Sequence, residues 1–325
     1  MRNTLQGIAD KAFPPDSPAH GRHFYATVRE TLNGYMVMNF KNIAIIGVGL
    51  IGSSFALSLK ARGFSGRITG IGRNEDNLLR AEEMGIIDAH TTVHAEGVRN
   101  ADLVLLASPV GRFEQIINDV RHELKAGAIV TDVGSVKAGV IRILEPLMPP
   151  GVNFVGGHPI AGKECSGIDA ATADLFTGAR CIITPSPRTD REALDTVVGM
   201  WEEIGSRTLL MNPEEHDLIF AAVSHLPHVV AYALVNTIID VDGGILHHGG
   251  NGLRDMTRIA LSPAELWRDI CIYNREEILG ILRKFSSYMS RIIKLMEETD
   301  WSGLEKEFAR AKEARRSIEP DQHKK

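Results

Sequence analysis

The chain has 325 residues, of which 44% are hydrophobic and 24% charged, and its formal net charge is −5. These values are ordinary for a globular protein, and the lack of a long basic run argues against nucleic acid as a partner. The three cysteines are widely spaced and form no CxxC pair, which argues against a disulfide framework or a metal site and is typical of the cytoplasm. No uninterrupted apolar run approaches the roughly 20 residues of a membrane helix.

The first forty residues differ from the rest of the chain. Residues 1–40 have no clear periodicity and lack the apolar segment of a signal peptide. We expect this extension to be disordered, or to result from a start codon assigned too early, since Met36 and Met38 lie just before the first strand. The tail at 317–325 is expected to fray.

Strands and helices are expected to alternate over the first half of the chain. We expect strands at residues 42–46, 67–71, 102–107, 128–131 and 153–155, and helices at 50–62, 75–84, 110–124 and 136–147. Such alternation predicts an α/β fold with a parallel, doubly wound sheet. Further strands at 181–184 and 208–210, around a helix near 192–204, are expected to extend that sheet.

The chain becomes helical beyond Pro213. The run 214–239 is apolar on more than one face, as helices buried in a domain core or a subunit interface are. Pro227 should kink it, because proline cannot donate the helical hydrogen bond. A loop rich in glycine and histidine follows, and then helices from residue 263 to about 315. We therefore expect a homodimer that forms through this helical region.

The first expected strand runs into Gly47-Val48-Gly49-Leu50-Ile51-Gly52. A GxGxxG run between a strand and a helix predicts dinucleotide binding. Gly47 would allow the tight turn, Gly49 the approach of a diphosphate, and Gly52 close packing of the helix. The expected organisation is a Rossmann-type domain at 41–211 and an all-helical substrate and dimerisation domain at 212–316.

The second strand ends without the carboxylate that usually binds the ribose of NAD. The residues there are Gly72 and Arg73, and an arginine at this place favours the 2′-phosphate of NADP, although NAD stays open. Ser108, Pro109 and Val110 follow the most apolar strand. Ligands bind at the carboxyl ends of strands in such sheets, so we expect this segment beside the cofactor.

Four further stretches carry residues suited to catalysis. Asp132–Lys137 (DVGSVK) and Gly156–Glu164 (GGHPIAGKE) both follow strands and should face the cleft. SHLPH places His225 and His228 three residues apart, and RDMTR places Arg254 and Arg258 four apart. Such spacings bring side chains to one face of a helix, and paired arginines suit carboxylate recognition.

Taken together, these motifs resemble the prephenate dehydrogenase family, which includes arogenate and cyclohexadienyl dehydrogenases. The resemblance rests on GVGLIG, DVGSVK, GGHPIAGKE, SHLPH and RDMTRIA…LWRD, in that order, and covers about residues 42 to 268. It implies an enzyme of tyrosine biosynthesis that oxidises a ring hydroxyl, releases the ring carboxylate as CO2 and transfers hydride to NAD(P).

The resemblance also implies roles for individual residues. His158 would accept a hydrogen bond from the substrate hydroxyl as base, and Ser135 would bind the same hydroxyl near the nicotinamide. The residues implied for the carboxylates of a small dicarboxylate substrate are His228, Arg254, Arg258, Glu164 and His225. Of the two histidines, His228 matches better, and a structural role for His225 stays open.

Two positions depart from the pattern of many relatives. Lys163 stands where a small residue is common, and Arg254 where lysine is common. Both leave open whether the substrate carries a keto-acid or an amino-acid side chain. The alternatives are a 3-hydroxyacid-type dehydrogenase, which would need a catalytic lysine in the helical region, and a non-enzymatic dinucleotide sensor, which would not need Ser135, His158 and Arg258 together.

Overall fold

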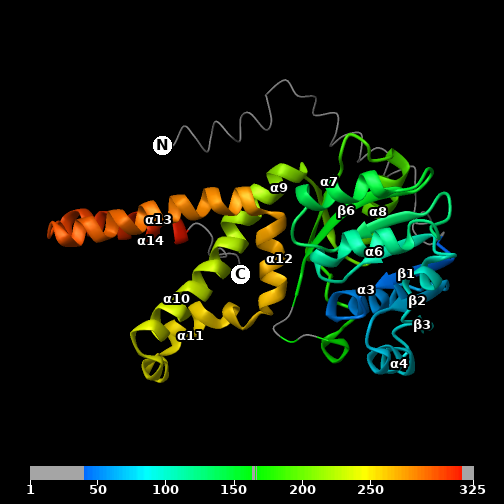
Figure 1. The fold of residues 1–325 in the computed structure, drawn as a ribbon, viewed down its shortest axis with the longest axis horizontal. Coiled ribbons are helices and arrows are strands. Elements are labelled where there is room, and N and C mark those ends of the chain that lie inside the picture. Colours follow the sequence, from blue (N-terminus) through cyan, green and yellow to red (C-terminus); the bar gives the residue numbers. More distant parts are fainter. Residues whose placement is uncertain (1–39, 163–164, 166, 317–325) are drawn as a thin grey trace, which may run out of the picture.

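The computed structural model describes residues 40–162, 165 and 167–316 (Figure 1). The sheet is built from β1 (Asn42–Ile46), β2 (Arg67–Ile71), β3 (Ala89–Thr91), β4 (Leu103–Leu106), β5 (Ile129–Asp132), β6 (Asn153–Ile160), β7 (Arg180–Thr184) and β8 (Arg207–Leu210). Its order is β3-β2-β1-β4-β5-β6-β7-β8, and all neighbours are parallel except β6 and β7. The expectations for residues 1–39 and 317–325 fall outside the described residues.

Helices cover both faces of this sheet. They are α3 (Leu50–Ala61), α4 (Glu75–Glu83), α5 (His94–Val98), η2 (Val110–Arg112), α6 (Phe113–Val120), α7 (Ala138–Leu144), η3 (Glu145–Leu147), η4 (Ile168–Ala170) and α8 (Arg191–Glu203). Side chains alternate along each strand, so Ile43 and Ile45 of β1 pack under α3, α4 and α8, whereas Ala44 and Ile46 pack under α5, α6 and α7. The predicted α/β fold with a doubly wound, mostly parallel sheet is confirmed.

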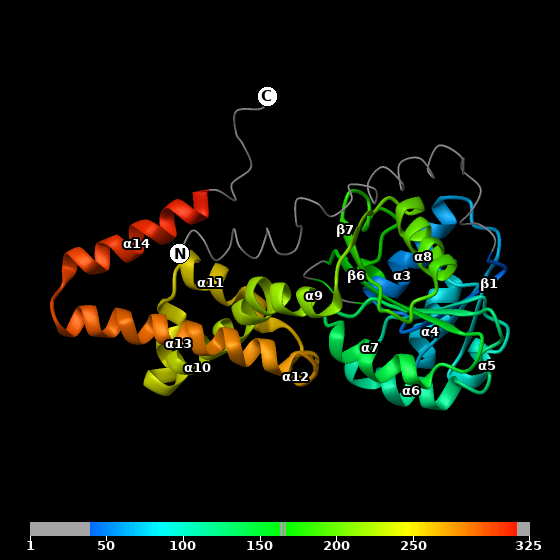
Figure 2. The same ribbon diagram turned by 90° about the horizontal axis from the view of Figure 1, so that it is seen from above.

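The second half of the described chain is helical. It comprises α9 (Pro213–Phe220), η5 (Ala221–His225), α10 (Leu226–Asp242), η6 (Gly243–His248), α11 (Asn251–Thr257), η7 (Arg258–Leu261), α12 (Ala264–Tyr273), α13 (Arg275–Glu297) and α14 (Trp301–Arg316). Figure 1 shows α13 extending away from the sheet, and Figure 2 shows α14 turning back from the far end of α13 and diverging from it, while α12 lies next to the sheet. Trp267 and Ile270 of α12 belong to the same apolar core as α6 and α7, so this helix joins the two parts.

The apolar run 214–239 lies in one continuous stretch of helix, as expected. Within it, η5 is one turn of π-helix that separates α9 from α10 and ends just before Pro227. Proline lacks an N–H and would clash with the carbonyl four residues earlier, so a wider turn at this place relieves the conflict. Pro227 itself stands in the first turn of α10, where a missing N–H costs little.

The stretch Pro213–His248 is long and apolar enough to cross a membrane by length and composition alone. It also carries His216, Asp217 and His225, whose buried side chains pack between the sheet and the other helices. A helix packed among other helices can have the same apolar composition as one that crosses a membrane. The stretch expected to be a loop after it forms η6 and the start of α11, and β3 and α5 were not predicted.

Candidate active site

The turn between β1 and α3 is shaped for a phosphate group. Gly47 has a φ of +110°, and a Cβ there would lie 2.5 Å from the backbone of Ala107. A Cβ on Gly52 would lie 2.2 Å from the carbonyl oxygen of Gly47, so only glycine lets α3 pack this closely. A Cβ on Gly49 would enter open space, with no atom of a described, non-adjacent residue within 4 Å. That space is where an anion can reach the backbone.

Helix α3 supports this reading. Its first turn has no acidic residue, and its N-cap, Gly49, offers no side-chain cap. The first N–H groups of the helix are therefore available to an anion. Leu50 and Ile51 are half-buried in this turn, and Ile51 packs against the core.

A cavity of about 730 Å³ opens over the turn, and its walls come from the ends of β1, β2 and β4 and from one face of α12. Of the residues predicted for the cofactor, it is lined by Gly47, Gly49, Arg73, Ser108 and Pro109. Val110 is instead buried in the core beneath it. The Ser108 hydroxyl is buried and has no hydrogen-bond partner among the described residues, so a bound molecule can satisfy it.

These residues fit a nicotinamide dinucleotide. The open space at Gly49 suits the diphosphate, and the end of β2 presents Gly72 and Arg73 to the ribose. Helix α12 adds Glu265, Arg268 and Asp269 to the wall, which the sequence did not indicate. The helical part of the chain therefore closes the cavity that the sheet opens.

His158 lies within a strand, and the expectation of a strand-end loop after Val155 is wrong. Strand β6 continues to Ile160 because its last residues pair antiparallel with β7, where His158 lies opposite Ile182. No local pattern indicates this pairing, since β7 begins twenty residues after β6 ends. A histidine in a paired strand is held more firmly than one in a loop.

The glycine pair before His158 serves close packing. A Cβ on Gly156 would lie 2.6 Å from Oγ1 of Thr184, and a Cβ on Gly157 would lie 2.8 Å from the carbonyl oxygen of Asp132. Neither glycine has a positive φ. The pair is therefore needed for the approach of neighbouring strands and not for a turn.

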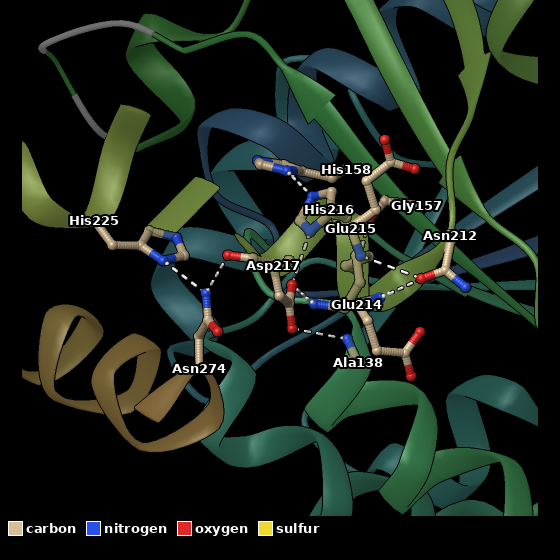
Figure 3. A network of polar contacts seen from close by, with 12 residues as sticks. Ala138, Gly157, His158, Asn212, Glu214, Glu215, His216, Asp217, His225 and Asn274 are labelled. Atoms are coloured by element: carbon tan, nitrogen blue, oxygen red, sulfur yellow. Dashed lines mark hydrogen bonds and ion pairs between the residues drawn. The ribbon is translucent and has the colours of Figure 1, made fainter. Parts of the chain in front are cut away.

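A chain of polar contacts runs inward from His158 (Figure 3). Its Nδ1 lies 2.8 Å from Nε2 of His216, and Nδ1 of His216 lies 2.8 Å from Oδ1 of Asp217. The ring of Phe220 packs against both histidines, with centroid distances of 4.7 Å and 4.5 Å. Helix α9 thus contacts His158 of β6 through His216 and Phe220, and Asp217 of the same helix contacts His216.

Burial keeps these histidines neutral. It lowers the pKa of His158 well below the usual value, and the neighbouring His216, Lys137 and His225 lower it further. Burial likewise lowers the pKa of His216 to about 2. Burial raises the pKa of Asp217, but its carboxylate accepts hydrogen bonds from the backbone N–H groups of Lys137 and Ala138, which act in the opposite direction. At neutral pH His158 is therefore an uncharged imidazole, able to accept a proton.

Lys137 and Asp132 form a buried ion pair behind His158, with both side chains inaccessible to solvent. Lys137 also donates to the carbonyl of Gly157 at 2.7 Å, and Asp132 accepts from the N–H of Gly157 at 3.1 Å. Both the N–H and the carbonyl of Gly157, the residue before His158, are therefore tied to this pair.

His225 ends the π-helix η5 and is fully buried. The amide of Asn274 donates both to the carbonyl of Asp217, at 2.8 Å, and to Nδ1 of His225, at 3.1 Å. The proton of the neutral ring is therefore on Nε2, which has no hydrogen-bond partner in the described part of the chain. Burial lowers the pKa of His225 to about 4, while the carbonyl of Ser135 raises it.

His228 is half-buried and stacks on Trp267, with 3.6 Å between ring centroids and 20° between planes. Its Nδ1 donates to the carbonyl of Ser224 at 3.0 Å, so Nε2 is the free acceptor. Burial lowers its pKa, and the charge of Arg258 lowers it further. The elements that carry the two residues, α10 and η7, pack against each other.

The remaining predicted site residues have fewer described contacts. Ser135 is half-buried just after β5, and its carbonyl acts on His225. Arg254 is exposed on α11, so it and Arg258 do not share one helix, because α11 ends at Thr257. Glu164 and Lys163 lie outside the described residues.

Sequence reasoning missed His216, Asp217 and Asn274, and left Trp267 out of the predicted site. His216 and Asp217 stand in NPEEHDLIF, where no pattern distinguished them from the polar residues just before them. Asn274 separates two helices, α12 and α13, and its side chain could not be assigned to the site without the fold.

Comparison with known proteins gives two family matches. Residues 55–210 match the model described as the nucleotide-binding domain of prephenate dehydrogenase, and residues 212–310 match the model of its dimerization domain. Among curated proteins, the cyclohexadienyl dehydrogenase of Zymomonas mobilis is 36% identical over 286 residues, which are 87% of this chain and 97% of that protein.

Solved structures agree. Prephenate dehydrogenase of A. aeolicus, in complex with hydroxyphenyl propionate and NAD+, is 38% identical with a TM-score of 0.81, covering 86% of this chain and 98% of that one. Arogenate dehydrogenase of Synechocystis is 28% identical with a TM-score of 0.69, covering 86% of this chain and all (100%) of that one.

Proposed function

The chain belongs to the prephenate dehydrogenase family, and we propose how its own residues carry out the reaction of that family. The protein is an NAD(P)-dependent oxidoreductase that converts prephenate to 4-hydroxyphenylpyruvate by oxidative decarboxylation, with arogenate as the related substrate. The family matches leave no support for the 3-hydroxyacid-type dehydrogenase or the non-enzymatic sensor. The observation that carries the proposal is the neutral, buried imidazole of His158, which lies in the part of β6 that extends beyond its parallel pairing with β5.

The chemistry defines what the site must do. A hydride leaves the ring carbon that bears the hydroxyl, the bond from the ring to its carboxylate breaks, and the electrons left behind complete an aromatic ring. The bound nicotinamide supplies the hydride acceptor. The product is a phenol, so the hydroxyl proton is only shared during the reaction and is not lost.

We assign His158 as the group that shares this proton. A hydrogen bond from the hydroxyl to a neutral imidazole increases electron density on oxygen as hydride departs, and such catalysis contributes roughly 10²–10⁴ in rate. Ser135, at the end of the neighbouring strand β5, would bind the same oxygen. Both residues follow the parallel pairing of β5 with β6, at the carboxyl edge of the sheet where open α/β folds bind ligands, although neither lines the cavity at the glycine turn.

The substrate's carboxylates need cationic partners. Arg258 supports this role, since its charge already acts on His228. Guanidinium groups bind carboxylates in a bidentate manner. The proposed carboxylate pocket comprises His228, Arg258 and Arg254, with Glu164 and His225 in the same network.

For the cofactor we propose a preference for NADP. Arg73 lines the cavity at the end of β2, where NAD-binding folds usually have a carboxylate, and Gly72 beside it adds no negative charge. Bound NAD in the A. aeolicus relative shows the dinucleotide of that protein only. A lower KM for NADP than for NAD is expected.

We propose that the protein is a cytoplasmic homodimer with domains at 41–211 and 212–316. The helical region matches a dimerization domain. It also exposes large apolar side chains in the single chain, among them Val241, Ile293, Met296, Trp301 and Phe308. Apolar surface of this kind is typical of an interface.

One set of assays tests the function. Purified protein is supplied with prephenate or arogenate, each with NAD and with NADP, and reduced nicotinamide is followed by absorbance. We expect reduction with at least one substrate. The absence of reduction with either substrate and both cofactors would overturn the proposal.

A further inference from the structure

We propose that His216 and Asp217 are positioning residues that fix the protonation of the His158 ring, leaving its Nε2 as a hydrogen-bond acceptor for the substrate. The inference rests on the proposed role of His158 as the base. It adds the contacts that decide which nitrogen of the His158 ring carries the proton. It is carried by a linear series of contacts from Asp217 through His216 to His158 (Figure 3).

The series begins at the carboxylate of Asp217, which accepts hydrogen bonds at both oxygens. Oδ1 of Asp217 accepts from the N–H of Lys137 at 2.7 Å, and Oδ2 accepts from the N–H of Ala138 at 2.9 Å. A protonated carboxyl would place its own proton against one of these N–H groups. Asp217 is therefore ionised, and Nδ1 of His216, 2.8 Å from Oδ1, must carry a proton.

The next two contacts follow from the first. A neutral imidazole has one N–H, so Nε2 of His216 holds a lone pair. It lies 2.8 Å from Nδ1 of His158, which must then donate. The proton of His158 is on Nδ1, and its Nε2 is left as the acceptor. The side chain of His216 has no exposure to solvent, so water does not compete for this contact.

This order of protons decides whether His158 can act. With the proton on Nε2, the ring would donate to the substrate oxygen and oppose the loss of hydride. In the Ser-His-Asp triad a carboxylate sets the tautomer in the same way, and losing it lowers kcat by about 10⁴. Here a second imidazole stands between the carboxylate and the base.

The arrangement also keeps the shared proton at the site. His216 and Asp217 are buried, and the series ends on backbone N–H groups. The O–H bond that weakens as the carbon–hydride bond breaks is therefore restored when the carbon–carboxylate bond breaks. This matches the balance of the reaction, in which the product phenol keeps its hydrogen.

Phe220 offers a test that separates hydrogen bonding from packing. It stacks on His216 with 27° between the rings, so His216→Phe keeps an aromatic ring in this place but removes the acceptor. His216→Gln removes the ring but keeps a carbonyl oxygen that can accept from His158. The control is His122→Phe, which replaces an exposed histidine distant from the site.

We expect His216→Phe to lower kcat at least about tenfold with unchanged affinity for the cofactor, and His216→Gln to recover part of that loss. A purely structural role predicts the reverse order, because the aromatic variant packs better. Wild-type kcat in His216→Phe, or a lower kcat in the glutamine variant than in the phenylalanine variant, would overturn the proposal.

A second measurement needs no substrate and no substitution at His216 or Asp217. ¹⁵N spectra of histidine-labelled wild-type protein report which ring nitrogen carries the proton, and the signals of His158 are identified by their loss in His158→Asn. We expect a protonated Nδ1. A protonated Nε2 would overturn the proposal. The ¹⁵N measurement does not depend on turnover. It therefore tests the protonation of His158 separately from the proposed function.

Discussion

Lys137 and Asp132 form an ion pair from which solvent is fully excluded, directly behind the strand that carries His158. The pair holds the N–H and the carbonyl of Gly157, so the position of the proposed base depends on two charges that never touch the substrate. Burial raises the pKa of Asp132, while the charge of Lys137 lowers it.

Breaking this pair should destabilise the fold. Lys137→Met leaves a buried carboxylate without a cation, which typically costs about 3–5 kcal/mol. Lys125→Met is the control, because it breaks a partly exposed pair with Asp102 that is worth about 0–1 kcal/mol. Urea unfolding at a fixed protein concentration measures both. Equal losses in the two variants would contradict the account of the buried pair.

The glycines of the first turn should differ in what they support. Gly49→Ala is expected to fold normally, because its Cβ enters open space, and to lose cofactor affinity because the Cβ occupies the place of the diphosphate. Gly52→Ala should lose stability, since its Cβ would lie 2.2 Å from a backbone oxygen. Thermal unfolding and cofactor titration separate the two effects. Unchanged affinity in Gly49→Ala would place the diphosphate elsewhere.

Cofactor choice should depend on Arg73. Arg73→Ala is expected to raise the KM for NADP about tenfold or more while changing that for NAD little, because a charge-assisted bond to the 2′-phosphate contributes about 1.5–3 kcal/mol. Arg80→Ala is the control, since that arginine lies on the neighbouring α4 and pairs with Asp169 of η4. A parallel rise of both KM values would remove Arg73 from cofactor selection.

Stability should fall with acid in a way that depends on His216. Its pKa is about 2 in the fold against 6.5 when unfolded, so below about pH 6.5 the unfolded chain binds a proton that the native chain does not. The contribution of His216 to the free energy of unfolding is fully present above that pH. It declines by about 1.4 kcal/mol per pH unit below it. His216→Phe removes the effect, so the wild type should lose more stability than this variant between about pH 7 and 5. Parallel urea midpoints across that range would contradict the assignment.

Much of the fold follows from local patterns in the sequence. Strands β1 and β2 begin and end where the apolar runs do, and Asn74 caps α4 as expected, accepting from the N–H of Asn77. These features depend on residues close together in the chain. Strand β6 was predicted too short because its second half is fixed by β7, and a pairing between distant segments has no local signal.

The site divides in the same way. The glycine turn and His158 stand in motifs that could be recognised, although whether each predicted residue binds substrate or cofactor stays a prediction. His216 and Asp217 stand in no motif, and their part depends on how α9 packs against the ends of β5 and β6. The π-helix that directs His225 inward also could not be foreseen, since only the strain at Pro227 marked its place.

The central claim is that His158 accepts the hydrogen bond that allows hydride to leave. The most direct test is kcat for His158→Asn, measured with the substrate that the wild type prefers and accompanied by cofactor titration. We predict a fall in kcat of about 10²–10⁴ with cofactor affinity unchanged. A variant that binds the cofactor normally and keeps a kcat near that of the wild type would contradict the account.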